Sequence, residues 1–248
     1  MSQHIVDAIA ICIPAAFFIA AILVGRILER ARPAEADQPA SEIAVDYRLA
    51  PETRFPGAFE DCLTAYRWTV RDGGVDPETV AVLGDSAGGN LAVAVTVAAR
   101  DESLPPPSCV AVISPFADLT LSGASMELRK LVDPYVTREL LQSMAAEYLA
   151  GADPADPRCS AVFADLHDLP PLLIQVGEDE ILFDDAVRIR DAATAAGVDT
   201  TFHPWTHGIH VWPVYISAGL PESALAIEDV AAFLKLHARN DSAKAEVS

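Results

Sequence analysis

The sequence makes a sharp, glycine-rich change of direction at Gly84-Asp85-Ser86-Ala87-Gly88-Gly89-Asn90. The run of strand formers Thr79-Val80-Ala81-Val82-Leu83 leads into it, and a long run of small apolar residues leads out. A strand, a tight turn and a helix in this order are typical of a nucleophile elbow, which holds the serine in strained backbone angles with its hydroxyl exposed. The pattern therefore predicts that Ser86 is a nucleophile. The alternative is a glycine-rich turn in which the serine only caps the helix.

A serine nucleophile needs a base to take its proton and a carboxylate to orient that base. With an elbow of this kind the chain order is serine, acid, histidine. A second buried strand is predicted at 171–177, and it runs into the acidic segment 178–185. Because ligands bind beyond the carboxyl ends of parallel strands, carboxylates placed there are candidates for the acid.

The candidate bases are His207 and His210, which both follow the last predicted strand, at 198–203. His210 is favoured because the apolar pair Val211-Trp212 follows it and can pack the ring in place. His207 stands beside Gly208 and has the character of a loop-surface residue. The other histidines are expected to be solvated or, for His203, part of the strand.

Several stretches of this chain resemble the hormone-sensitive-lipase-like family of α/β-hydrolases. They are Val45-Asp46-Tyr47-Arg48-Leu49-Ala50-Pro51-Glu52, the GDSAGG-type elbow at 84–89, Ser114-Pro115-Phe116-Ala117-Asp118, Leu169-Pro170-Pro171 and His210-Val211-Trp212. These motifs stand in family order and cover about residues 42 to 238. The resemblance implies a carboxylic ester hydrolase for small acyl esters or lactones that uses no cofactor and no metal.

The resemblance also indicates which carboxylate is the acid. The family's acid stands two residues before a leucine and four before an aspartate, which is the position of Glu180, ahead of Leu182 and Asp184. Asp179 is the alternative. Asp184 and Asp185 are expected to begin the next helix, where acidic side chains favour the positive end of the helix dipole.

The oxyanion of an acyl-transfer intermediate needs preorganised N–H donors. One donor is expected from Ala87, the residue after the nucleophile. The family takes the others from a His-Gly-Gly loop, but at that spacing this chain has Ile13-Pro14-Ala15-Ala16. Proline lacks an N–H and alanine resists positive φ. The resemblance therefore predicts a slow enzyme, or, as the alternative function, a crippled hydrolase-fold protein that acts as a binding module. It also implies that the family's first two strands and N-terminal cap segment are missing from this chain.

The uncharged run from Ala8 to Gly25 allows two interpretations. Its eighteen residues are marginally long enough for a membrane span, and Arg26, Arg30 and Arg32 after it would leave the rest of the chain in the cytoplasm. The favoured alternative is a strand followed by the start of a helix, because continuous apolar strands are normal in parallel sheets. The expected location is cytoplasmic, with membrane anchoring as the alternative.

Composition narrows the class of protein. With 248 residues, 51% of them hydrophobic, the chain can build one sizeable core. Thirty-six acidic residues against seventeen basic ones give a net charge of −19, which disfavours nucleic acid and anionic surfaces as partners. The four cysteines are far apart and are expected to be buried, reduced thiols rather than disulfides or metal ligands.

Alternation of strands and helices predicts an α/β fold with a mostly parallel sheet and helices on both faces. The expected strands are 42–47, 79–84, 108–114, 171–177 and 198–203, and the expected helices are 57–72, 87–101, 182–196 and 221–238. Residues 122–150 are expected to form two cap helices without a strand between them. The expected organisation is an apolar N-terminal segment over 1–40, one hydrolase domain over 41–240 and a disordered tail over 241–248.

Overall fold

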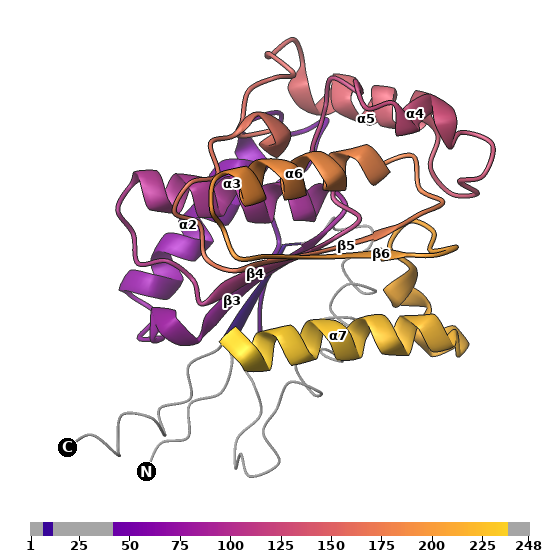
Figure 1. The fold of residues 1–248 in the computed structure, drawn as a ribbon. Coiled ribbons are helices and arrows are strands. Elements are labelled where there is room, and N and C mark those ends of the chain that lie inside the picture. The colour runs from indigo at the N-terminus through magenta and orange to yellow at the C-terminus, as the bar shows by residue number, and fades with distance from the viewer. Residues whose placement is uncertain (1–6, 12–41, 238–248) are drawn as a thin grey trace.

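The structure is a computed structural model, and it describes residues 7–11 and 42–237. Its centre is a parallel sheet of six strands in the order β2-β1-β3-β4-β5-β6. The strands are β1 (Asp7–Ile11), β2 (Glu42–Val45), β3 (Val80–Asp85), β4 (Cys109–Ile113), β5 (Leu172–Gly177) and β6 (Thr200–Trp205). Figure 1 shows the sheet between two layers of helices, which confirms the predicted fold class.

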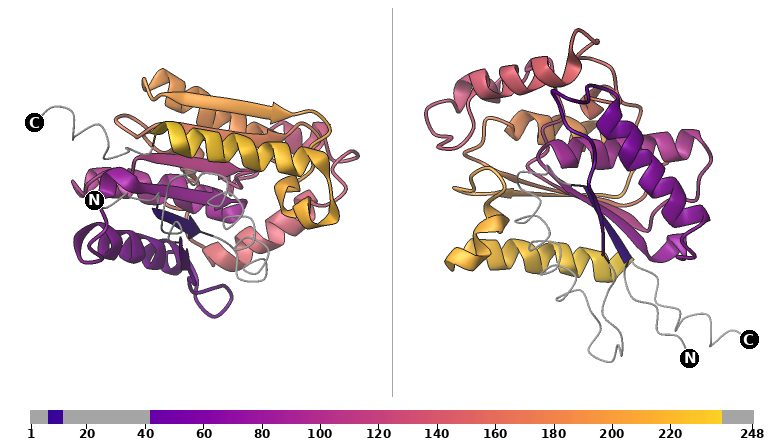
Figure 2. Two further views of the ribbon diagram at one scale, coloured as in Figure 1. Left: turned by 90° about the horizontal axis from the view of Figure 1, so that it is seen from below. Right: turned by 180° about the vertical axis from the view of Figure 1, so that it is seen from behind.

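One face of the sheet is covered by α2 (Gly57–Arg71), α3 (Ala87–Asp101) and α6 (Phe183–Ala195), and the other by α7 (Pro221–His237) (Figures 1 and 2). Alternate residues of each strand supply the two cores, because successive side chains point to opposite faces. Val80 and Val82 join the core under α2, α3 and α6. Ala81 and Leu83 join the core under α7.

A third apolar cluster lies beyond the carboxyl ends of the strands, beneath α4 (Ser125–Leu128) and α5 (Arg138–Leu149). The prediction of two helices without a strand between them over 122–150 is confirmed, although α4 is a single turn. The cluster joins both segments to the stretch after β5, through Met126, Val136, Leu141, Ile181 and Leu182.

The last strand begins two residues later than predicted. Gly197 has a positive φ of 80° and Val198 N–H donates to the Ala193 carbonyl, so both residues still belong to the end of α6. The strand then continues through Pro204 to Trp205, two residues beyond the predicted end at 203. Proline is tolerated there because β6 is an edge strand and needs no donor on its outer side.

The strand interpretation of the N-terminal run is confirmed over Asp7–Ile11, which form β1 between β2 and β3. A membrane span over 8–25 is therefore wrong for its first residues, because Ala8–Ile11 are paired in the sheet. Within the described ranges, no helix combines the length and apolar character that a bilayer crossing requires. The rest of the run, most of the expected 1–40 segment and the expected tail lie outside the described residues.

Candidate active site

Ser86 occupies the turn between β3 and α3 with strained backbone angles, φ 52° and ψ −122°. A Cβ added to Gly84 would lie 2.2 Å from the carbonyl oxygen of Gly88, so only glycine fits where strand and helix meet. The Ser86 hydroxyl makes no capping hydrogen bond to α3. The helix-cap alternative is therefore wrong, and the turn holds the hydroxyl for another partner.

That partner is His210. The Ser86 Oγ lies 3.0 Å from His210 Nε2, and His210 Nδ1 lies 3.0 Å from Glu180 Oε2. The imidazole is 8% exposed and Glu180 is fully buried. The three side chains come from the ends of β3, β5 and β6, which the parallel sheet brings to one edge.

The second oxygen of Glu180 is also held. Oε1 accepts hydrogen bonds from the Ser114 hydroxyl, at 2.6 Å, and from Gly177 N–H, at 2.7 Å. Ser114 Oγ in turn accepts from Val211 N–H at 3.0 Å, next to the histidine. Ser114 has a positive φ of 49° and is fully buried.

Sequence reasoning missed the role of Ser114. The signal in the sequence is its position at the end of the predicted strand 108–114, on the same edge of the sheet as Ser86. In the motif at 45–52, Arg48 donates to Asp61 through its backbone N–H, at 2.9 Å, and through its guanidinium.

Asp179 and His207, the alternative acid and base, lie near each other away from Ser86. His207 Nδ1 is 3.4 Å from Asp179 Oδ2, and the His207 side chain is 87% exposed. Neither residue makes a hydrogen bond to Ser86 or His210 in the described part of the chain. The geometry thus favours Glu180 and His210 over this pair.

A close backbone crossing fixes the loop of the acid against the loop of the histidine. A Cβ added to Gly177 would lie 2.1 Å from the Gly208 carbonyl oxygen, and one added to Gly208 would lie 2.9 Å from Gly177 Cα. The same carbonyl accepts from Asp179 N–H at 3.2 Å. A side chain at 177 or 208 would therefore force the two loops to shift relative to each other.

Asp85, beside the nucleophile, is buried, and burial raises the pKa of its carboxyl to about 6, while the nearby His210 acts in the opposite direction. Among the described residues, the hydrogen bonds of Ser86 Oγ and of the two His210 nitrogens join these atoms to one another and to Glu180, not to the Asp85 side chain. The structure therefore gives Asp85 no direct part in the Ser86–His210–Glu180 arrangement.

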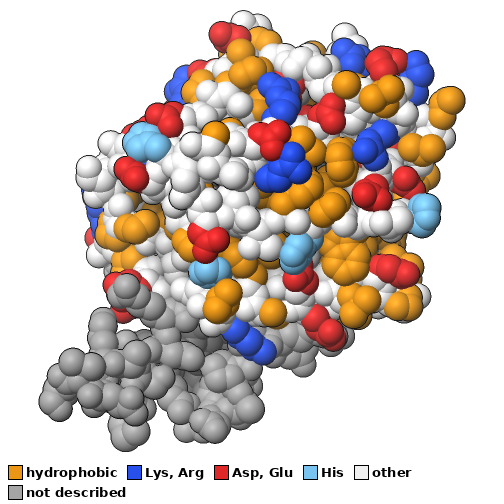
Figure 3. All heavy atoms as spheres, in the orientation of Figure 1, with side chains coloured by type: hydrophobic (Ala, Val, Ile, Leu, Met, Phe, Trp, Pro, Cys, Tyr) orange, Lys and Arg blue, Asp and Glu red, His pale blue; other side chains and the backbone are white. Residues whose placement is uncertain are grey.

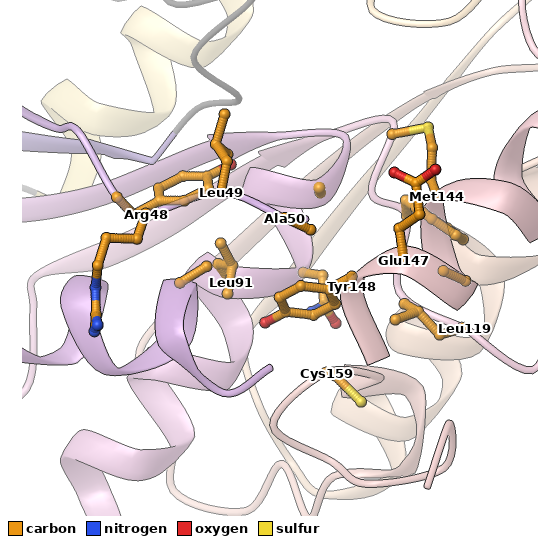
Figure 4. Close-up of a pocket in the computed structure, with 15 residues that line it drawn as sticks. Arg48, Leu49, Ala50, Leu91, Leu119, Met144, Glu147, Tyr148 and Cys159 are labelled. Carbon is orange, nitrogen blue, oxygen red and sulfur yellow. The ribbon is translucent and has the colours of Figure 1, made fainter. Parts of the chain in front are cut away.

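A pocket of about 300 Å³ opens beside the N-terminus of α3. Its walls come from the segment 47–50, from α3 and from α5, and Figure 4 shows Leu91, Leu119, Met144 and Tyr148 around it. Ala87 belongs to the wall, so the pocket adjoins the residue after Ser86. Most of its surface is apolar, which suits a hydrocarbon chain.

Ala87 is the first residue of α3, so its N–H has no acceptor within the helix. It points from the positive end of the helix dipole, which suits a negatively charged oxygen. The predicted gap in the oxyanion loop, at Ile13-Pro14-Ala15-Ala16, lies outside the described residues.

The described residues contain no group of three or more histidine, cysteine or acidic side chains that could hold a metal ion. Three of the four cysteines lie in the described ranges, and Cys62, Cys109 and Cys159 are buried and form no disulfide there. Cys12 lies outside those ranges.

Residues 36–214 match a family model described as the alpha/beta hydrolase fold. The chain belongs to the α/β-hydrolase fold family. This membership agrees with the motif order and with the serine elbow at the end of β3.

Curated α/β-hydrolases with similar sequences include two bacterial enzymes. The chain is 45% identical over 196 residues to an acetyl-hydrolase of Streptomyces hygroscopicus, covering 79% of this chain and 65% of that protein. It is 36% identical over 192 residues to an esterase of Acinetobacter venetianus, covering 77% of this chain and 63% of that protein. The chain thus spans somewhat less than two thirds of the length of these relatives.

Solved α/β-hydrolase structures are also similar. An esterase from the bacterial hormone-sensitive lipase family matches with a TM-score of 0.88 and 36% identity, over 95% of this chain and 78% of that one. The esterase EstE5, soaked with p-nitrophenyl butyrate, matches with a TM-score of 0.86 and 39% identity, over 94% of this chain and 78% of that one. The resemblance to the hormone-sensitive-lipase-like family is confirmed.

Proposed function

We propose that this chain is a carboxylic ester hydrolase that acts on small acyl esters or lactones through an acyl-enzyme. Ser86 is the nucleophile, His210 the general base and then the general acid, and Glu180 the carboxylate that orients the imidazole. The observation that carries the proposal is the continuous hydrogen-bonded path from Ser86 Oγ through both nitrogens of His210 to Glu180 Oε2.

Acylation begins when His210 Nε2 takes the proton of the Ser86 hydroxyl as Oγ attacks the carbonyl carbon of the ester. The carbonyl oxygen becomes an oxyanion, and Ala87 N–H donates a hydrogen bond to it. Glu180 stabilises the imidazolium that has formed. The imidazolium then gives its proton to the alkoxide, the ester C–O bond breaks, and the alcohol leaves.

Deacylation repeats these steps with water. His210 Nε2 takes a proton from the water molecule, whose oxygen attacks the acyl carbon, and then returns the proton to Ser86 Oγ as the acid departs. Each proton that His210 accepts is given back within the same half-reaction. The reaction requires neither a metal nor a cofactor, in agreement with the resemblance.

The size and character of the pocket support a small acyl group. It adjoins Ala87, where the carbonyl oxygen is stabilised, and its volume of about 300 Å³ accommodates a short hydrocarbon chain. The names of the similar proteins, an acetyl-hydrolase and an esterase, agree with this substrate class.

Hydrolysis of p-nitrophenyl acetate by the whole chain, and by Ser86→Ala, tests the proposal. We expect release of p-nitrophenol with the wild type and a loss of kcat by at least about 10³-fold in the variant, because removal of the nucleophile leaves only binding and oxyanion stabilisation. Absence of hydrolysis in a folded wild type would favour the binding-module alternative.

A further inference from the structure

A tyrosine on the loop between α4 and α5 lies directly against the imidazole. The rings of Tyr135 and His210 are 6.1 Å apart between centroids, with 26° between their planes. Tyr135 is nevertheless 61% exposed, so the residue is accessible to a ligand. This arrangement leaves an open aromatic surface beside the group that moves the protons.

The backbone on either side of Tyr135 is fixed by one carboxylate. Asp133 Oδ1 accepts from the N–H groups of Tyr135 and Val136, both at 2.9 Å, and Asp133 Oδ2 accepts from Ile181 N–H at 3.0 Å. Ile181 follows Glu180 directly, and Val136 is buried in the cluster beneath α5. The loop that carries Tyr135 is therefore fastened to the loop that carries the acid.

The two parts of an ester must lie on different sides of Ser86. The acyl carbonyl is bonded to Ser86 Oγ in the intermediate and its oxygen lies near Ala87, next to the pocket. The alcohol oxygen must lie within hydrogen-bond reach of His210 Nε2, because that nitrogen gives it a proton as it leaves. The alcohol portion is therefore placed on the His210 side, where Tyr135 lies.

We propose that Tyr135 is the binding surface for the alcohol portion of the substrate, and that it favours an apolar, in particular an aromatic, alcohol. This inference rests on the proposed ester hydrolysis. An aromatic alcohol can stack on the exposed ring or meet its edge. The same loop continues the apolar surface through Leu131 and Val132, which are 92% and 54% exposed. Figure 3 shows hydrophobic side chains over α4 and this loop.

The acyl and alcohol sides thus differ in how closely they restrict the substrate. The acyl group enters a pocket of limited volume, whereas the alcohol rests on an open surface. The substrate class that fits both is an ester of a short acid with a larger apolar or aromatic alcohol.

The test compares kcat/KM for phenyl acetate and ethyl acetate, which share one acyl group, in the wild type and in Tyr135→Ala. This ratio of constants reports the steps up to acylation, during which the alcohol is still attached. We expect Tyr135→Ala to lower kcat/KM for phenyl acetate about three- to tenfold, the range of one aromatic contact, with little change for ethyl acetate. Tyr135→Phe keeps the ring and should retain the wild-type value for both esters.

Two further variants sharpen the comparison. Asp133→Ala removes the carboxylate that holds the loop of Tyr135 and also releases Ile181 N–H beside Glu180. It should therefore lower kcat/KM for both esters, and more strongly for phenyl acetate. Trp68→Ala is the matched control, because it removes an aromatic residue of α2 that is 53% exposed. It should leave kcat/KM unchanged for both esters.

The inference is overturned if Tyr135→Ala lowers kcat/KM equally for phenyl acetate and ethyl acetate, since the ring would then only orient His210. It is also overturned if kcat/KM changes for neither ester. A changed preference between phenyl acetate and phenyl butyrate would also overturn it, because the ring would then contact the acyl group. Failure of the proposed function looks different: no ester is hydrolysed, or hydrolysis survives in Ser86→Ala.

Discussion

The Ser114 hydroxyl donates to Glu180 Oε1 at 2.6 Å and is, among the described residues, the only side chain besides His210 with a hydrogen bond to this buried carboxylate. The same oxygen of Ser114 accepts from Val211 N–H, so one hydroxyl fixes the acid and the backbone next to the base. The hydrogen bond leaves Glu180 Oε2 directed at His210. Ser114 is thus placed to position the acid and the base without touching the substrate itself.

Replacing Ser114 with alanine should lower kcat about 10- to 100-fold with KM nearly unchanged, because a hydrogen bond to a charged group contributes about 1.5–3 kcal/mol. Ser114→Gly also lacks the hydroxyl but accommodates the positive φ without strain. Steady-state kinetics and thermal unfolding of both variants check this. If Ser114 matters only because it adopts a positive φ, Ser114→Gly will keep the wild-type kcat, which would contradict our expectation.

The assignment of the acid separates two adjacent carboxylates. Glu180→Gln should lower kcat by about 10⁴-fold without unfolding the protein, because the amide no longer stabilises the imidazolium. Asp179→Asn should change kcat less than threefold, since Asp179 pairs with the exposed His207. The measurement is kcat for p-nitrophenyl acetate in both variants, and the reverse order would transfer the role to Asp179.

Stability should depend on pH through a buried carboxyl outside the site. Burial raises the pKa of Asp185 to about 8, although the N–H groups of Ala117 and Asp118 donate to it. A raised pKa means that the folded state binds the proton more tightly than the unfolded state, so this group's contribution to stability falls as pH rises from about 4 to about 8.

Asp185→Asn does not titrate, and its amide oxygen can accept both N–H groups. The difference in free energy of unfolding, Asp185→Asn minus wild type, should increase by up to about 1.4 kcal/mol per pH unit between pH 5 and pH 8. Urea unfolding of both proteins at pH 5, 6.5 and 8 measures the difference. Parallel pH dependences would show that the Asp185 pKa is not raised.

Turnover should respond to residues 13–15, where the resemblance places the family's His-Gly-Gly loop. Replacing Ile13-Pro14-Ala15 with His-Gly-Gly should raise kcat at least about tenfold, because one oxyanion donor contributes about 10²–10³ in kcat. The readout is kcat for p-nitrophenyl acetate beside the rate of serine labelling by a fluorophosphonate, which should change less. A contrary result would be a wild-type kcat near ~10 s⁻¹ that does not change in the His-Gly-Gly variant. Other donors would then stabilise the oxyanion.

The sequence was sufficient for the sheet and most helix bounds because its apolar runs are short, strand-like and separated by amphipathic segments. The turn at Ser86 was also predictable, because Gly84 and the strand before Ser86 leave few alternatives to a tight strand-to-helix turn. Chain order and the apolar Val211-Trp212 pair were enough to favour His210, which the geometry places 3.0 Å from Ser86.

The contacts that depend on distant segments could not be predicted. Ser114 and Glu180 are 66 residues apart, and Asp133 and Ile181 are 48 apart, so nothing local marks them as partners. The approach of Gly177 to Gly208 likewise exists only once β5 and β6 are paired. The predicted end of the last strand at 203 was too early, because Pro204 continues β6 at the edge of the sheet, where a proline is tolerated.

The rate of fluorophosphonate labelling, mapped to the modified peptide, reports whether His210 activates Ser86, since the reaction requires an activated serine but no particular acyl group. We expect an adduct on Ser86 at similar rates in the wild type and in His207→Ala. Labelling should be at least about 10³-fold slower in His210→Ala, and Ser86→Ala should carry no adduct on that peptide. Labelling that persists in His210→Ala but is lost in His207→Ala would contradict this expectation, because the exposed histidine would then be the base.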